Sequence, residues 1–538
     1  RKYSVNINFT ESYKQGYIYT YTLTLNNTGM EVTSVAVTPW EEGTQDSGNL
    51  DVLYDKYIVK IAVPSDGYTF THNMKNFVGT IDWGDNNIED VTSEISWPTH
   101  TYATAGEYTV TVYGAIDKLN NYDEENGEAK ETAFTELVYI GEKLGITSME
   151  KAFMYAANLQ KIHPGALDGG SKINNFFGAF ARCEKLVSIP AGLFDKCTEA
   201  ENMRNMFDGC KGLTEIPAGL FDNNKKATNF QAVFFGCEGL TSIPQGLFDY
   251  NTEVTNFAGV FGNCSNLSSI PAGLFDNCTE VTSFSQVFVN CDKIKNIPEG
   301  IFDNCPEVTN FGGAFSGCHG ITSIPAALFK NNTKVTNFGT TFNMVRITEI
   351  PAGLFDSCPD VTNFYWTFSG TYITGIPEGL FDNNTKVTSF EYTFNGCKKL
   401  TSIPTGLFDN NTKVTNFENT FRSCTGLISI PEGLFDKCPE VTTFAYTFGY
   451  CNGLKNVPTG LFDNNTKVTK FGYTFNSCVA LTGESPYTTI NVNGEDKKVH
   501  LYERSLYPEH FTAPTSYKQC FKGNTGLTDF DNIPIEWK

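Results

Sequence analysis

The stretch IPTGLFDNNTKVTNFENTFRSC (Ile403 to Cys424) holds no group in an obviously reactive setting, yet it returns with small changes along most of the chain. Its consensus is IPxGLFDxN(T/P)xVTxFxxTFxxCxxLTS, and successive prolines are 27 residues apart, or 26 in three of the gaps. A short period repeated this often predicts a solenoid, in which each repeat packs on its neighbours. The repeat prolines are Pro164, Pro190, Pro217, Pro244, Pro271, Pro298, Pro325, Pro351, Pro377, Pro404, Pro431 and Pro458.

Each repeat divides into two similar halves, such as LTSIPTGLFDNN and VTNFENTFRSC. Both begin with a tetrad in which apolar residues flank Thr and a small polar residue, and such residues favour an extended chain. The GLF and NTF segments that follow are too short for a full helix, so we expect single helical turns. Each coil should contribute one strand from LTSIP and a weaker one from VTNF, paired in parallel at about 4.8 Å per coil.

Phenylalanine fills one position of the repeat in every copy, and two further positions, such as Phe408 and Phe417, are nearly as regular. Large apolar side chains at a fixed spacing are what a close-packed stack of coils needs, so these rows are predicted to be core. The invariant row is Phe180, Phe207, Phe234, Phe261, Phe288, Phe315, Phe342, Phe368, Phe394, Phe421, Phe448 and Phe475.

The cysteines fall into two rows on the same period. Other copies have Asn in the early row, as at Asn411, and the last copy has Asn524 in the late row. A position that accepts Asn or Cys suits a small buried side chain that donates to backbone carbonyls at a turn. We therefore expect free thiols, with stacked disulfides or a metal site as alternatives. The late row is Cys183, Cys210, Cys237, Cys264, Cys291, Cys318, Cys397, Cys424, Cys451 and Cys478, and the early row is Cys197, Cys278, Cys305, Cys358 and Cys438.

An aspartate follows the GLF phenylalanine in most copies and stacks like charges along the solenoid. We expect these residues to close Asx-type turns by accepting hydrogen bonds from backbone N–H groups. A ladder of Ca²⁺ sites is the alternative, which Lys330 in the same row weakens. The row is Asp195, Asp222, Asp249, Asp276, Asp303, Asp356, Asp382, Asp409, Asp436 and Asp463.

The segments VTNFENTFRSCTGL and ENMRNMFDGCKGL resemble the BspA-like leucine-rich repeats of bacterial surface proteins. The resemblance covers residues 142–538 and departs from the family pattern in the extra residue of most coils and in IPxGLFD. It implies adhesion through the solenoid surface and no catalytic residues common to the family. The predicted fold class is mainly β with short helical turns: a leucine-rich-repeat-like solenoid of about 12 coils of 26–27 residues, preceded by β domains.

Residues 49–141 contain an alternation of Tyr and Val around Thr, after a Gly turn, that predicts a strand. GTIDWGDN and THTYATAGEYTVTVYG resemble a PKD-like β-sandwich module, in which Trp83 and Tyr102 would be core and Asn86 stands where the family has glycine. The resemblance implies a spacer on a surface protein. DKLNNYDEENGEAKE, near the end of this domain, is expected to be an acidic loop.

Residues 1–48 contain two alternating segments around NNTG, which predicts a hairpin. They resemble the closing strands of a fimbrillin-like domain, with TQDSGNL as a linker. At the other end the period breaks after Cys478, where YTTINVNGEDKKVHLYERS predicts an inserted hairpin that turns at NGED. SYKQCFKGNTGLTDF then resumes the repeat. We expect the hairpin and a C-terminal cap, at about 482–538, to cover the open end of the solenoid; a ligand site is the alternative.

The composition narrows the possible functions. A formal net charge of −21 over 538 residues argues against nucleic acid as a partner. No apolar run approaches the roughly 18 residues that would span a bilayer. The opening RKYSVNINF resembles a strand more than a signal peptide, so we expect a processed or truncated product. The six His are scattered and the carboxylates recur with the period, so no enzyme activity, cofactor or metal is predicted.

The most variable position that we expect at the surface lies two residues after the second Phe of each coil. Because close packing holds core positions to one size, a position that ranges from Gly to Trp should face outward. It holds Ala232, Gly259, Gln286, Gly313 and Thr340 in earlier copies and Trp366, Tyr392, Asn419, Tyr446 and Tyr473 in later ones.

Aromatic residues are enriched where binding energy concentrates, so the later copies offer a candidate platform for a sugar or a protein. Its residues are Tyr365, Trp366, Tyr392, Tyr446 and Tyr473; the alternative is that these rings only pack on one another. Together with the resemblance, this predicts a cell-surface or secreted protein that binds a protein or glycan on a host or microbial surface. Carbohydrate capture for nutrition and an architectural stalk or fimbrial role are the competing interpretations.

Overall fold

The computed structural model describes residues 17–26, 29–39 and 56–538, the first two ranges by their backbone alone. The chain divides into two compact units, residues 1–53 and 54–538. In the first unit β1 (Tyr17–Asn26) pairs antiparallel with β2 (Gly29–Pro39), which confirms the predicted hairpin. The expected strand RKYSVNINF and the linker TQDSGNL lie outside the described residues.

The second unit begins with a β module whose main sheet has the strand order β14-β13-β3-β9-β6-β7. A ribbon of β4 and β8 packs on it, with the Phe70 ring 5.2 Å from that of Phe134. Trp83 and Tyr102 are fully buried, as predicted, and the Tyr102 hydroxyl donates to the Trp83 carbonyl at 2.8 Å. The strands are β3 (Lys56–Val63), β4 (Tyr68–Thr71), β5 (Met74–Lys75), β6 (Phe77–Asp82), β7 (Ile88–Ile95), β8 (Thr99–Tyr102), β9 (Gly106–Ala115), β10 (Lys118–Leu119), β11 (Tyr122–Asp123), β12 (Glu128–Ala129) and β13 (Phe134–Ile140).

This β module continues directly into the solenoid. Its strand β13 pairs in parallel with β14 (Lys161–Ile162) of the first coil, beyond the short 3-10 helix η1 (Glu142–Leu144). The Asn73 amide donates to the Ala152 carbonyl at 2.7 Å, and the buried apolar side chains form one core from the module to the last coil. The boundary expected after residue 141 therefore falls inside a continuous core, so the module covers the open first coil.

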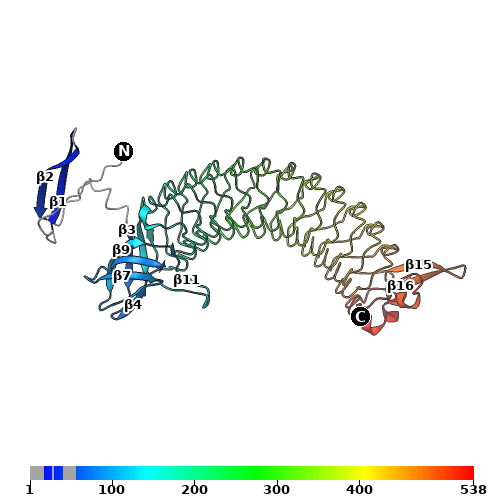
Figure 1. Ribbon diagram of the computed structural model, residues 1–538. Helices are drawn as coiled ribbons and strands as arrows, with labels where there is room; N and C mark the ends of the chain where they lie inside the picture. Colours follow the sequence, from blue (N-terminus) through cyan, green and yellow to red (C-terminus); the bar gives the residue numbers. More distant parts are fainter. Residues whose placement is uncertain (1–16, 27–28, 40–55) are drawn as a thin grey trace. The chain divides into compact units, whose positions relative to one another are not determined.

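The coils of the solenoid stack in a curved row (Figure 1). They pair through single parallel bridges at the third residue of the VTNF tetrad, from Ser148 to Ser516. Beyond β14 of the first coil, no strand forms at LTSIP within the described coils, whereas the bridges at VTNF run through the stack, so the predicted ranking of the two tetrads is wrong. LTSIP ends in proline, which has no N–H, and it makes single bonds such as that from the Ser268 N–H to the Thr241 carbonyl at 3.2 Å.

The continuous hydrogen-bond ladder runs instead through the segment after the VTNF asparagine. The N–H groups of Phe257, Gly259, Phe261 and Asn263 donate to carbonyls of the next coil at 2.6–3.1 Å. Between them, N–H groups such as that of Val260 turn back to carbonyls three residues earlier. The turns expected at GLF and NTF are therefore single turns, and the described residues contain no α-helix. Among these residues no helix is long and apolar enough to cross a bilayer.

Three rows of phenylalanine fill the solenoid, as predicted. Neighbours in the invariant row stack almost parallel, and the rings of Phe261 and Phe288 are 5.9 Å apart at 6°. Rings of the other two rows pack against each other, as Phe248 does against Phe257 at 4.7 Å. All of these side chains are fully buried or nearly so, so each coil presents the same apolar surface to the next.

The C-terminal end carries the predicted insertion and cap. Strands β15 (Tyr487–Val492) and β16 (Glu495–His500) form the expected hairpin, and Ser516 resumes the bridge row with Lys470. The 3-10 helices η2 (Leu501–Leu506), η3 (Phe530–Asn532) and η4 (Ile535–Trp537) complete the end. The Trp537 ring covers the last coil, stacked 4.8 Å from Tyr517.

Arg504 of η2 closes the row of buried asparagines. Its guanidinium donates to the carbonyls of Phe462 and Asn465 at 2.8 and 3.0 Å. One coil earlier, the Asn465 amide itself donates to the equivalent carbonyls, those of Phe435 and Cys438. Arg504 thus supplies the donors that the next asparagine of the row would have supplied.

Candidate functional site

The variable surface row has one unusual backbone feature. All ten residues identified from the sequence are left-handed, with φ between 55° and 68°. A left-handed conformation is natural for Gly259 but costly for β-branched or bulky residues such as Thr340 and Trp366. The coil-to-coil ladder imposes this conformation, because the N–H groups of the row residue and of the residues two before and two after it donate to the next coil, as at Phe257, Gly259 and Phe261. We call these residues, Ala232, Gly259, Gln286, Gly313, Thr340, Trp366, Tyr392, Asn419, Tyr446 and Tyr473, the first left-handed row.

A second left-handed row lies four residues further along each coil. It includes Gly236, Asn263, Asn290, Met344 and Tyr450. Side chains of both rows leave the coil beside the ladder, so neighbouring coils place them next to one another. Side chains in both rows vary in size between coils, whereas the phenylalanine rows stay nearly constant.

The candidate aromatic residues meet in two groups. Trp366 and Tyr392 stack with ring centroids 4.4 Å apart at 19°, and Tyr365 meets both rings edge-on at 5.9 Å. Tyr446 and Tyr473 stack at 4.3 Å and 2°. Tyr365 is 38% exposed and the others are half-buried. Since the rings stack face to face, ring edges rather than one flat surface point outward.

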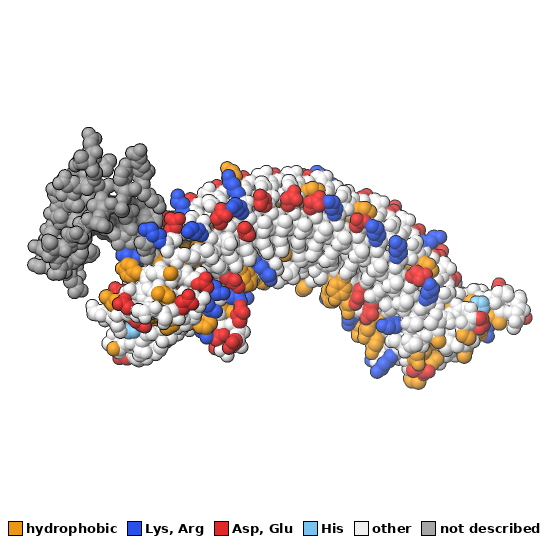
Figure 2. Space-filling model, in the orientation of Figure 1, with side chains coloured by type: hydrophobic (Ala, Val, Ile, Leu, Met, Phe, Trp, Pro, Cys, Tyr) orange, Lys and Arg blue, Asp and Glu red, His pale blue; other side chains and the backbone are white. Residues whose placement is uncertain are grey.

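Asn419 and Arg422 separate the two groups. Asn419 is buried, and the Arg422 guanidinium donates to its side-chain oxygen at 3.4 Å. The same guanidinium lies 5.0 Å from the Tyr446 ring and 5.3 Å from that of Tyr450. The result is a surface of rings and one cation. In Figure 2, hydrophobic side chains gather on the inner edge of the C-terminal half of the coil stack.

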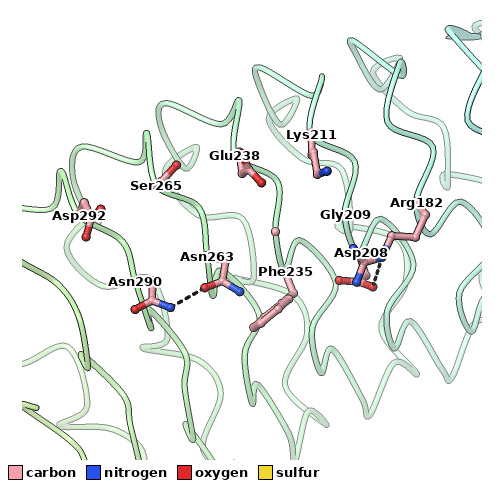
Figure 3. A pocket seen from close by; sticks show the side chains of 11 residues that line it. Arg182, Asp208, Gly209, Lys211, Phe235, Glu238, Asn263, Ser265, Asn290 and Asp292 are labelled. Carbon is pink, nitrogen blue, oxygen red and sulfur yellow. Dashed lines mark hydrogen bonds and ion pairs between the residues drawn. The ribbon is translucent and has the colours of Figure 1, made fainter.

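The N-terminal coils carry a groove that the sequence analysis did not identify (Figure 3). It has a volume of about 340 Å³ and lies across the rows where Gly209 and Gly236 have no side chain. Arg182 and Asp208 form an ion pair at 3.3 Å at one end, and the Asn290 amide donates to Asn263 at 2.8 Å at the other. Burial raises the pKa of Asp208, and Arg182 offsets this only in part. The glycines in both left-handed rows are the sequence feature that could have revealed this groove.

The repeats match the model of the BspA type leucine rich repeat region, over residues 149–312, 241–395 and 314–482. These ranges cover more than half of the chain. The chain belongs to the BspA-type leucine-rich-repeat family. BspA-type repeats indicate a protein-binding role at a surface.

Comparison with other proteins adds little to the family assignment. No curated protein matches this BspA-type chain. Among solved structures, the Toll–Spatzle complex, a hub in Drosophila development and innate immunity, aligns over 66% of this chain and 51% of that chain, with 16% identity and a TM-score of 0.31. The TLR13–ssRNA13 complex aligns over 71% and 68%, with 10% identity and a TM-score of 0.26. The chain thus spans about half of the Toll chain, and at these scores the likenesses support no argument about function.

The cysteine rows of this BspA-type solenoid behave as predicted. All sixteen thiols are free and buried. The Cys210 thiol donates to the Phe180 carbonyl at 3.2 Å, and the Asn224 amide donates to the carbonyls of Phe194 and Cys197. Asn and Cys are therefore exchangeable because both are small donors to the preceding coil. Burial raises the pKa of Cys305 to about 12, which makes a reactive thiolate scarce.

The aspartate row differs from the expectation. No backbone N–H among the described residues donates to these carboxylates, so the Asx-turn prediction is wrong. The carboxylate of Asp276 lies over left-handed Gly273, where an added Cβ would come within 2.8 Å of it. Lys330 instead pairs with Asp303 at 2.7 Å. Within the described ranges, no three His, Cys, Asp or Glu side chains are grouped to hold a metal.

Proposed function

We propose that this chain is a non-enzymatic recognition protein of a bacterial cell surface, exposed there or secreted, that binds a protein partner through the aromatic groups of its C-terminal coils. Family membership supports a surface protein-binding role. The observation that carries the proposal is the placement of four aromatic side chains in a row that the first coils fill with small or polar residues, with Tyr365 packed beside Trp366 and Arg422 against Tyr446.

The chemistry of these groups fits a protein interface. Tyr, Trp and Arg are the residues in which binding energy concentrates at interfaces, and rings with half-buried sides are already held in place. Burial raises the pKa of the Tyr392 hydroxyl, and the nearby carboxylates of Glu418 and Glu391 add to this. The patch therefore offers apolar edges, hydroxyl donors and charges of both signs, which suits a partner with a mixed surface.

The test is a screen of the purified chain against arrays of secreted and surface-displayed host and microbial proteins. A binder from the screen is then titrated against Trp366→Ala and Tyr446→Ala, each expected to weaken binding by about 1–2 kcal/mol. Gln286→Ala is the matched control, since Gln286 has the same left-handed backbone in an N-terminal coil. Equal affinity of both aromatic variants and the parent chain would rule out this surface as the binding site.

A further inference from the structure

The ring of Phe235 differs from the stacked rings of the C-terminal coils. The rings of Trp366, Tyr392, Tyr446 and Tyr473 are covered by one another. Phe235 is half-buried, and the structure gives it no ring contact with any described aromatic residue. Its ring therefore keeps a surface that a ligand can cover.

Glycines of the next coil hold this ring in place. A Cβ added at Gly262 would come within 2.6 Å of the ring, and one at Gly259 within 3.3 Å. The ring thus rests against the backbone where side chains are missing. Figure 3 shows it between Asp208 and Asn263 in the groove. A supported aromatic ring flanked by polar side chains is a common way to orient a small ligand.

The polar groups around the ring are mainly amides. Asn263 and Asn290 lie on one side, and Asn205, Gln231 and Gln286 line an adjoining hollow of about 290 Å³ that shares Phe235, Arg182 and Asp208. Amides donate and accept, and the Asp208 carboxylate accepts from two directions. The groove also carries both charge signs, with Arg182 and Lys211 against Asp208, Glu238 and Asp292. A ligand rich in hydroxyl groups matches this mixture of amides and opposite charges better than a strongly charged ligand does.

The backbone of the groove offers little to a peptide strand. The N–H groups of Phe234, Gly236, Phe261 and Asn263 are bonded to the next coil at 2.6–3.1 Å. A peptide that adds a strand needs free backbone groups on its receptor. Recognition here must come from side chains and from the ring.

We propose that this groove binds a neutral oligosaccharide, with one sugar ring packed on Phe235 and its hydroxyls bonded to Asp208, Asn263 and Asn290. The site lies in the N-terminal coils and is independent of the aromatic groups proposed to bind a protein. Its volume, about 340 Å³, is at the lower end of the range for ligand pockets and fits one or two sugar units of a chain that runs along the coils.

The experiment is calorimetric titration of the full chain with neutral hexasaccharides, namely maltohexaose, cellohexaose, xylohexaose and mannohexaose, and with acidic hexagalacturonate. At least one neutral probe is expected to bind, and Phe235→Ala to weaken that binding at least tenfold. Phe177→Ala is the matched control, because Phe177 is also half-buried on the surface but lies outside the groove. Phe235→Leu keeps the apolar volume without the ring and shows the same loss if Phe235→Ala fails to fold.

Three outcomes would overturn the proposal: no neutral probe binds, only hexagalacturonate binds, or Phe235→Ala and Phe235→Leu bind as tightly as the parent chain. Trp366→Ala should leave sugar binding unchanged. Its effect on a protein partner is measured separately, so the oligosaccharide site and the protein site can fail independently.

Discussion

The N-terminal and C-terminal coils of the solenoid share a core and differ at the surface. The segments FQAVFFGC (residues 230–237) and FAYTFGYC (residues 444–451) have Phe and Cys at the same buried positions. Between them, Ala232 and Phe235 of the first segment correspond to Tyr446 and Gly449 of the second. The first arrangement leaves a groove beside one supported ring, and the second fills the row with stacked rings.

A core position changes one coil before the aromatic residues begin at Trp366. Before the invariant Phe, three of the earlier coils have Val233, Val260 and Val287, whereas the coils from Thr341 to Thr474 have threonine. Each threonine hydroxyl donates to backbone carbonyls, as that of Thr393 does to Phe364 and Phe390 at 3.0 and 2.8 Å. The two halves therefore keep the same packing with different side chains at this position, valine in three of the earlier coils and threonine in the later ones. Surface rows can diverge because the ladder and the Phe rows do not depend on them.

The largest expected effect tests whether the two halves share one core. Phe315→Ala and Phe421→Ala should each cost about 3–5 kcal/mol of unfolding free energy, because both rings are fully buried in the invariant row. Denaturant unfolding monitored by circular dichroism measures the change. A cost below about 0.5 kcal/mol at either position, as for a surface residue, would contradict a common core.

The repeat period was enough to predict the solenoid, the Phe core and the exchange of Asn for Cys. Each depends on a side chain whose size and polarity are set by packing at one position of the repeat. Such positions stay constant when the repeat copies are aligned. The hairpin at NGED was predictable for a similar reason, because Asn493 and Gly494 both have positive φ in its turn.

The surface was harder to predict from the sequence. Nothing in a row that includes Thr340 and Trp366 indicates a left-handed backbone, since that conformation is imposed by bonds to the neighbouring coil. The groove depends on missing side chains at Gly209, Gly236 and Gly262, which come from different coils. A spacing of about 5 Å between coils is compatible with stacked rings and with a flat platform, so only the structure distinguishes the two.

The second prediction separates the two ends of the solenoid. Arg504→Ala leaves the buried Asn465 carbonyl without a donor, a loss that costs about 1–3 kcal/mol, while the Phe462 carbonyl keeps the backbone N–H of Asn465 at 3.2 Å. The loss should be confined to the C-terminal coils. Hydrogen exchange should therefore speed up for amides of residues 434–478 and stay unchanged for residues 186–240.

Arg346→Ala is the control for this prediction, because Arg346 is exposed in a middle coil. Faster exchange spread evenly over both halves of Arg504→Ala would instead mean that the solenoid unfolds as one unit from either end. Burial lowers the pKa of Arg504 to about 10, so the guanidinium remains charged at neutral pH and keeps its donors.

The third prediction concerns the stacked rings themselves. Tyr446→Ala loses the stack with Tyr473 and the contact with Arg422, and should cost about 1 kcal/mol of stability, as aromatic pairs usually contribute. Gln286→Ala, in the same row of an N-terminal coil, should stay within about 0.5 kcal/mol of the parent chain. A Tyr446–Tyr473 double-mutant cycle isolates the pair. Zero coupling would show that the rings adjoin without stabilising one another.

The smallest expected effect tests the exchange of valine for threonine in the core. Thr393→Val removes a buried hydroxyl, but the Phe364 and Phe390 carbonyls each keep a backbone donor, the N–H groups of Thr367 and Thr393. The cost should therefore lie near the lower end for a hydrogen bond, about 0.5 kcal/mol. Val260→Thr makes the reverse change in an N-terminal coil and should be equally mild, since the Phe230 carbonyl there can accept a second bond. Paired denaturant titrations measure both variants. A loss above about 2 kcal/mol in Thr393→Val alone would mean that the C-terminal coils need their hydroxyl row, and that the cores of the two halves are not interchangeable.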